Sequence, residues 1–194
     1  MAPLPFPLIR NEYYHIYNRA IAGNLLFREN RNYQFFLSKI ERYILPDAEL
    51  IAYCLMPNHY HFILKLKIDN ISTAMQRMAL SYVKSYNIVY QQSGHLFQAP
   101  YQRIHITNLN YLLHLSRYIH LNPVKARIVQ KAENWEYSSY LEYIGLREAE
   151  YINTEVILDL INQIPGANNK IKQQEYKNFV EMWEFEYMEF KMQR

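Results

Sequence analysis

Hydrophobic and polar positions over the first 106 residues follow two periods, which predict four strands and two helices. Runs of β-prone or alternating residues predict strands over 12–18, 49–55, 59–67 and 101–106. Apolar residues at helical spacing predict helices over 30–45 and 71–89. This order is the βαββαβ order of ferredoxin-like proteins. We therefore predict an α+β fold with an antiparallel sheet, in which the third strand lies centrally beside the first.

Helical patterns continue after the sheet. They predict a helix over 108–122 with Thr107 as N-cap, a short helix over 123–129 opened by Pro123, and further helices over 154–164 and 170–192. The last one carries an apolar stripe of Tyr176, Phe179, Val180, Trp183 and Tyr187. We divide the chain into a main domain, 1–148, and a C-terminal helical extension, 149–194. The extension could fold back on the core, cover a site or support dimerisation.

A turn at Pro57 and Asn58 leads into the strand that starts at His59. Because side chains alternate along a strand, His59 and His61 share one face, and Tyr60 lies on the other. Two imidazoles at this spacing can converge on one metal ion. The alternative is a pair of polar residues on a solvated face.

Composition adds three constraints. Half of the 194 residues are hydrophobic, so the chain can bury a sizeable core. There is no apolar run of membrane-spanning length and no cleavable leader pattern, which predicts a soluble, cytoplasmic protein without a membrane partner. The single cysteine, Cys54, excludes an internal disulfide and a cysteine-rich zinc site.

Charge is distributed unevenly along the chain. Residues 70–132 contain seven Lys or Arg and no Asp or Glu, although the net charge of the whole chain is only +3. An acid-free, basic stretch suits a polyanion, because each Lys or Arg set against a phosphate releases a counterion. This favours a nucleic-acid partner over a chance clustering of surface charge.

The helix predicted over 108–122 places Tyr111, Leu115, Tyr118 and Asn122 on one face. Each has a structural interpretation: Tyr118 as a packing residue, and Asn122 as the N-cap of the next helix. For two histidines the sequence pattern indicates no catalytic role. His15 faces either the core or the nucleic acid, and His120 is expected to face solvent.

Several motifs resemble, in order, those of one family. Residues 56–62, Met-Pro-Asn-His-Tyr-His-Phe, resemble the His-hydrophobic-His ("HUH") motif of single-tyrosine transposases. Residues 117–126, Arg-Tyr-Ile-His-Leu-Asn-Pro-Val-Lys-Ala, resemble the downstream motif of their REP-associated branch, as do residues 14–19 and 135–140. The resemblance spans about residues 10–148. Tyr60 is an unusually polar occupant of the hydrophobic slot, and His120 and Lys125 depart from the family pattern.

The resemblance implies a metal-dependent endonuclease and strand transferase acting on single-stranded hairpin DNA. It implies Tyr118 as nucleophile and His59, His61 and Asn122 as ligands of a divalent ion, Mg²⁺ or Mn²⁺. Attack would give a 5′-phosphotyrosine. Candidate DNA contacts are Asn18, Arg19, Arg77, Lys84 and Arg103.

Two other functions fit the residues less well. A non-catalytic nucleic-acid binder of ferredoxin-like fold would stack bases on sheet aromatics. A replication or conjugation initiator would use similar nicking chemistry, but such proteins usually carry additional domains. The sequence leaves open a monomer or a homodimer, and whether Tyr118 serves its own site or a partner's.

Overall fold

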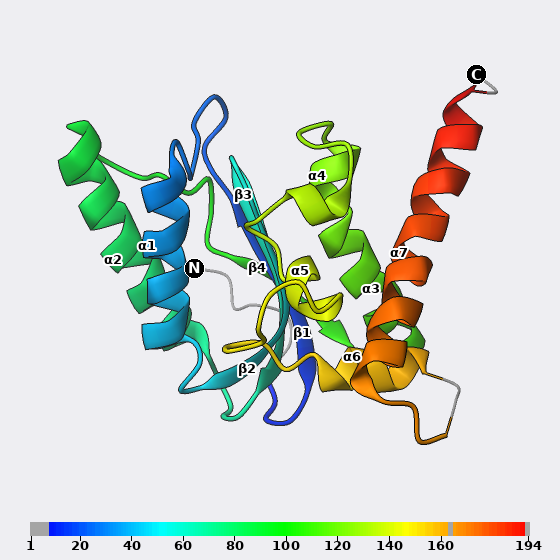
Figure 1. Cartoon of the computed structure of the whole chain (residues 1–194). Coiled ribbons are helices and arrows are strands. Elements are labelled where there is room, and N and C mark those ends of the chain that lie inside the picture. Colours follow the sequence, from blue (N-terminus) through cyan, green and yellow to red (C-terminus); the bar gives the residue numbers. More distant parts are fainter. Residues whose placement is uncertain (1–7, 163–164, 193–194) are drawn as a thin grey trace. The chain divides into compact units, whose positions relative to one another are not determined.

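The computed structural model describes residues 8–162 and 165–192, with the side chains of 183–192 left out (Figure 1). Trp183 and Tyr187 of the predicted apolar stripe therefore lie outside the described side chains. The chain forms two compact units, one of residues 1–50 and 55–107 and one of residues 51–54 and 108–194. None of the helices in the described part is long and apolar enough to cross a membrane.

The first unit is built on the predicted βαββαβ order. Its elements are β1 (Tyr13–Arg19), α1 (Asn30–Tyr43), β2 (Ala48–Met56), β3 (His59–Leu66), α2 (Ser72–Tyr90) and β4 (Gln102–Ile106). The strand order in the sheet is β2-β3-β1-β4, and β1 is antiparallel to both β3 and β4. The predicted α+β, ferredoxin-like fold is confirmed, with β3 central and beside β1.

Strand register separates two faces of the sheet. Asn18 is paired with Tyr60, and Ile16 with Phe62, and paired residues share a face. On that face Phe36 of α1 packs against Tyr60 and Phe62, with ring centroids 5.2 and 6.3 Å apart. Helices α1 and α2 cover this core face (Figure 1). The polar-looking Tyr60 is thus a core residue.

The opposite face carries the histidine strand's other side chains. Arg19 is paired with His59, Tyr17 with His61, and His15 with Ile63. We call this the histidine face. The turn before it is fixed by the loop after β1, since Leu26 N and Phe27 N both donate to Pro57 O, at 2.8 and 3.0 Å, and Ala20 N donates to Asn58 O at 2.8 Å. The backbone of the two residues before His59 is therefore fixed by hydrogen bonds to the loop after β1.

The second unit is helical. It contains α3 (Leu109–His120), α4 (Asn122–Lys125), the 3₁₀ turn η1 (Ala132–Asn134), α5 (Tyr140–Tyr143), α6 (Glu155–Ile161) and α7 (Asn169–Met192). Residues 51–54 of β2 group with it because Ser139 N donates to Tyr53 O at 3.0 Å and Tyr143 Oη donates to Ile51 O at 2.7 Å. The boundary predicted at residue 148 stays a prediction.

Two predicted helix limits are wrong. Asn108, not Thr107, is the N-cap of α3, because its extended backbone lets the side-chain oxygen accept from Tyr111 N. Helix α4 ends at Lys125 rather than at 129. Arg127 adopts a left-handed conformation with φ of 59°, which stops the helix.

The C-terminal helices pack on α3 within this unit. Tyr176 and Val180 of α7 are fully buried, as the predicted stripe requires. The guanidinium of Arg117 in α3 lies 4.2 Å from the ring centroid of Phe179 and donates to its carbonyl oxygen at 3.3 Å. The extension thus folds back on the helix that carries Tyr118.

Candidate functional site

His59 and His61 lie side by side on the histidine face of β3. Their ring centroids are 5.1 Å apart and their planes stand nearly perpendicular, at 84°. His61 is 9% exposed, and His59 is half-buried at the end of the strand. The rigid central strand therefore holds two imidazoles close together, as the alternation along the sequence predicts.

The Nδ1 atom of each imidazole has a hydrogen-bond partner. His59 Nδ1 lies 2.7 Å from Asn58 Oδ1, an amide oxygen that can only accept, so Nδ1 is the protonated nitrogen and Nε2 carries the lone pair. His61 Nδ1 lies 3.0 Å from Nε2 of His15 on β1. Metal-binding histidines are typically held in this way, with one nitrogen bonded to a neighbour and the other ligating the ion.

Both imidazoles are neutral at physiological pH. Burial, and then the neighbouring His15 and His59, lower the pKa of His61 to about 3. Burial also lowers the pKa of His59, and the charge of Arg19 adds to that effect. Since a metal binds the neutral form, no proton competes with the ion at pH 7. Within residues 8–162 and 165–182, no three His, Cys, Asp or Glu side chains gather in a metal-binding group.

Tyr118 and Asn122 belong to the second unit. Tyr118 is 42% exposed, so it is not the packing residue of the alternative interpretation. Leu121 occupies the N-cap position of α4, so Asn122 is not its cap. The Asn122 amide nitrogen donates to the carbonyl oxygens of Tyr118 and Ile119, at 3.0 and 3.4 Å. This turns the amide oxygen, the metal-binding atom of an asparagine, away from those carbonyls.

Lys125 lies against the ring of Tyr118. Its ammonium nitrogen is 4.3 Å from the ring centroid, which is cation–π distance. Burial, and then the charge of Arg117, lower the pKa of Lys125 to about 8. The motif contains this lysine, but its contact with the tyrosine depends on how α3 turns into α4, and the sequence does not show that.

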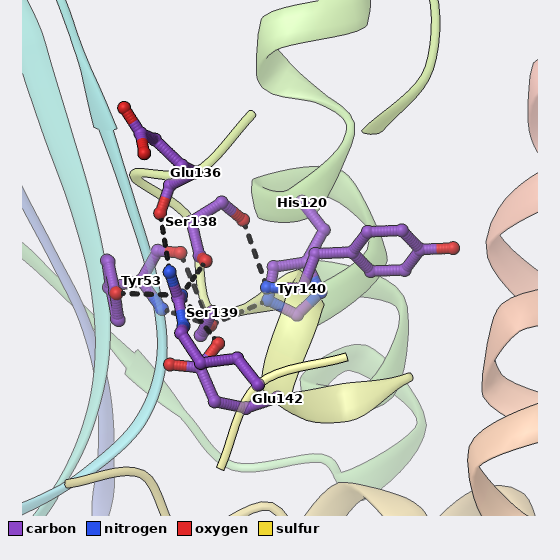
Figure 2. A network of polar contacts seen from close by, with 8 residues as sticks. Tyr53, His120, Glu136, Ser138, Ser139, Tyr140 and Glu142 are labelled. Atoms are coloured by element: carbon purple, nitrogen blue, oxygen red, sulfur yellow. Dashed lines mark hydrogen bonds and ion pairs between the residues drawn. The ribbon is translucent and has the colours of Figure 1, made fainter. Parts of the chain in front are cut away.

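A buried polar network supports the Tyr118 helix (Figure 2). His120, expected at the surface, is fully buried: its Nδ1 lies 2.7 Å from Tyr176 Oη and its Nε2 2.8 Å from Ser139 Oγ. Beside it, Arg147 donates to Glu142 Oε2 at 2.6 Å and to Tyr53 Oη at 3.1 Å. The sequence did contain a signal for this burial, because helical spacing places His120 beside Ser116 and Ile119, on the buried side of α3.

The candidate DNA contacts are distributed over several surfaces of the first unit. Arg19 is exposed and opposite His59, on the histidine face. Asn18 is 7% exposed, donates to Ala99 O at 3.1 Å and accepts from Arg19 N at 2.8 Å, so it braces the loop. Arg103, paired with Ile16, belongs to the core face, and Arg77 and Lys84 are exposed on α2. Of the five residues, only Arg19 shares the face of the two histidines.

Comparisons with solved structures find a similar fold. No family model and no curated protein matches the sequence. A solved structure of a REP-associated tyrosine transposase bound to a REP hairpin matches with a TM-score of 0.65 and 19% identity. The match covers 79% of this chain and 92% of that one. The two chains share a fold, and the resemblance read from the sequence motifs is confirmed at that level.

Proposed function

We propose that this protein is a metal-dependent single-stranded DNA endonuclease and strand transferase that acts on hairpin DNA. The observation that carries the proposal is the pair of neutral imidazoles on β3, each with Nδ1 already bonded. Such an arrangement is that of metal ligands rather than of solvated surface residues. The shared fold supports the proposal, because a transposase with that fold was solved with a REP hairpin.

The residues present fit a divalent ion. His59 and His61 would bind it through Nε2, and Asn122 would add its amide oxygen. Three neutral ligands suit Mn²⁺, and Mg²⁺ with waters completing its shell. When bound, the ion supplies Lewis-acid stabilisation of charge on the phosphoryl oxygens.

Tyr118 would be the nucleophile. Its hydroxyl oxygen attacks the scissile phosphorus in line, a new oxygen–phosphorus bond forms, and the bond from phosphorus to the 3′ oxygen breaks. The phenol gives up its proton and the departing 3′ oxygen gains one. Because one phosphate ester replaces another, the 5′-phosphotyrosine can be resolved by a second strand's 3′ hydroxyl without ATP.

The proposal joins residues of both units. The imidazoles belong to the first and Tyr118 and Asn122 to the second, so both must reach the same phosphate, within one chain or between two copies. Arg19, on the histidine face, is the proposed contact to the DNA backbone beside the scissile phosphate. Arg77, Lys84 and Arg103 would contact the hairpin away from it.

The decisive test is a covalent adduct on a denaturing gel. Wild-type protein with labelled single-stranded hairpin DNA and Mn²⁺ should give a shifted protein band, and EDTA should abolish it. Tyr118→Phe should lose the adduct and keep hairpin binding. Tyr111→Phe is the matched control, since Tyr111 is a similarly exposed tyrosine on the same helix, at 44% against 42%.

An adduct that persists in Tyr118→Phe would overturn the assignment of the nucleophile. Hairpin binding that ignores EDTA, with no adduct from the wild-type protein at any Mn²⁺ concentration, would instead identify a non-catalytic nucleic-acid binder.

A further inference from the structure

A third histidine lies behind the pair. His15 of β1 is 5% exposed, and its Nε2 is 3.0 Å from His61 Nδ1. The two rings are stacked, with centroids 5.2 Å apart and planes inclined by 25°. Tyr17 packs against His15 with a centroid distance of 4.9 Å. His15 therefore touches a proposed metal ligand from the side away from the ion.

The other ring nitrogen of His15, Nδ1, is buried without a hydrogen-bond partner, which is unusual. Among the described residues, His15 Nδ1 is one of two buried side-chain polar atoms without a hydrogen-bond partner. Leaving such a group unsatisfied is destabilising, because it gives up its hydrogen bonds to water without replacement. An apolar residue of similar size would fill the same space without that cost, so packing does not explain a histidine here.

The hydrogen bond between the rings can be made in two ways, and they differ in what they offer a metal. In one, His61 Nδ1 donates to His15 Nε2, so His61 Nε2 carries a lone pair and the proton of His15 is on its Nδ1. In the other, His15 Nε2 donates, and the proton of His61 is on its Nε2. Only the first arrangement lets His61 ligate an ion through Nε2.

We infer that His15 is a positioning residue that holds His61 in the metal-binding tautomer by accepting a hydrogen bond from its Nδ1. The inference rests on the proposed function. Its consequence is that the ion, through His61, also fixes His15 with its proton on Nδ1. The orphaned nitrogen is then a buried N–H group, whose cost is offset by metal binding.

Metal affinity tests this role in isolation. Mn²⁺ alone is titrated into the full chain and the free ion is followed by electron paramagnetic resonance. His15→Phe keeps an aromatic ring but cannot accept, and should weaken Mn²⁺ binding about 10- to 100-fold. His15→Gln, whose amide oxygen can accept, should recover most of the affinity. His105→Phe is the control, since His105 is on neighbouring β4, bonds Glu12 and stacks on Tyr14.

Wild-type spectroscopy keeps the inference testable if a variant fails to fold. Nitrogen-15 chemical shifts with saturating Mg²⁺ should show His15 protonated on Nδ1 and unprotonated on Nε2. A metal-bound protein with His15 protonated on Nε2 overturns the inference. So does a folded His15→Phe variant with wild-type Mn²⁺ affinity, and neither result touches the proposed nuclease. If the wild-type protein binds no Mn²⁺, with or without hairpin DNA, the metal site of the proposed function falls too.

Discussion

Lys125 places a positive charge over the face of Tyr118, 4.3 Å from the ring centroid. Negative charge develops on a phenol as it attacks a phosphate, and it spreads into the ring beneath that cation. A partly buried cation–π contact is worth about 1 kcal/mol or more. Lys125→Ala should therefore slow adduct formation at pH 7 roughly fivefold or more, measured in single-turnover gels. Lys131→Ala, which removes an exposed cation that pairs with Glu133, should leave the rate unchanged.

The advantage given by Lys125 should depend on pH. Burial lowers the pKa of this lysine to about 8, so its charge is present below pH 8 and lost above it. The ratio of wild-type to Lys125→Ala rates should fall towards one as pH rises past 8. A ratio that stays constant from pH 7 to pH 9.5 would contradict an electrostatic role.

His120 makes the stability of the fold sensitive to acid. Full burial lowers the pKa of His120 to about 3, against 6.5 in an unfolded chain. Between these values the unfolded chain binds a proton that the folded protein does not, so the free energy of unfolding falls as pH falls below 6.5. The contribution of His120 to the loss of unfolding free energy between pH 7 and pH 5 should be about 2 kcal/mol.

Urea unfolding of His120→Gln at the two pH values checks this. The variant should be the less stable protein at pH 7, and the difference from wild type should narrow by about 2 kcal/mol at pH 5. The exposed His95 provides the comparison: His95→Gln should leave the free energy of unfolding at pH 7 close to that of the wild type. A difference that does not narrow would mean that His120 is protonated in the folded state.

At the scale of elements, a buried hydroxyl links α7 to α3, in addition to the contact between Arg117 and Phe179. Tyr176 Oη lies 2.7 Å from His120 Nδ1 and 2.9 Å from Ser116 Oγ, both on α3. Tyr176→Phe keeps the ring and removes both bonds, and should lower the free energy of unfolding by about 1–3 kcal/mol. Chemical denaturation measures this loss, and the control Tyr111→Phe, at the exposed start of α3, should change the free energy of unfolding by close to zero. Equal losses of unfolding free energy for Tyr176→Phe and Tyr111→Phe would contradict a stabilising role of the Tyr176 hydroxyl.

The elements were predictable from the sequence to a large extent, because most of them depend on local patterns. The strand from His59 to Leu66 begins with alternating polar and apolar residues, and α1 repeats its apolar residues at helical spacing. The end of α4 was not predictable, since it depends on a left-handed Arg127, a conformation that non-glycine residues adopt only in particular surroundings. The cap of α3 was ambiguous between two adjacent capping residues, Thr107 and Asn108.

The positions of site residues were predictable where the regular backbone alone decides which way a side chain points. Alternation places His59 and His61 on one face, but no local pattern shows that His15, 46 residues earlier, meets His61 from β1. The same holds for Asn18, whose side chain braces the loop at Ala99. Its proposed DNA contact remains a prediction, as do the roles of Tyr118 and Asn122.

For the whole molecule, the basic residues should fall into two groups. Arg19 shares the histidine face, whereas Arg77 and Lys84 lie on the outer side of α2. Arg19→Ala should lower the cleavage rate even with saturating hairpin DNA. Arg77→Ala should weaken hairpin binding and reduce the slope of log affinity against log salt by about one, with the saturated rate unchanged. Fluorescence anisotropy over a salt series, with single-turnover cleavage, separates the two outcomes, and identical profiles would contradict the division.

The grouping of residues 51–54 with the helical unit restricts how the gene can be cut. A fragment starting at residue 108 would carry every helix of that unit but would lack the main-chain oxygens of Tyr53 and Ile51, to which Ser139 N and Tyr143 Oη donate. Both donors would then be exposed to water, together with the apolar surface that the strand covers in the full chain. Recombinant expression of residues 108–194 should therefore yield insoluble material, whereas a split gene that supplies the missing strand should recover a soluble product.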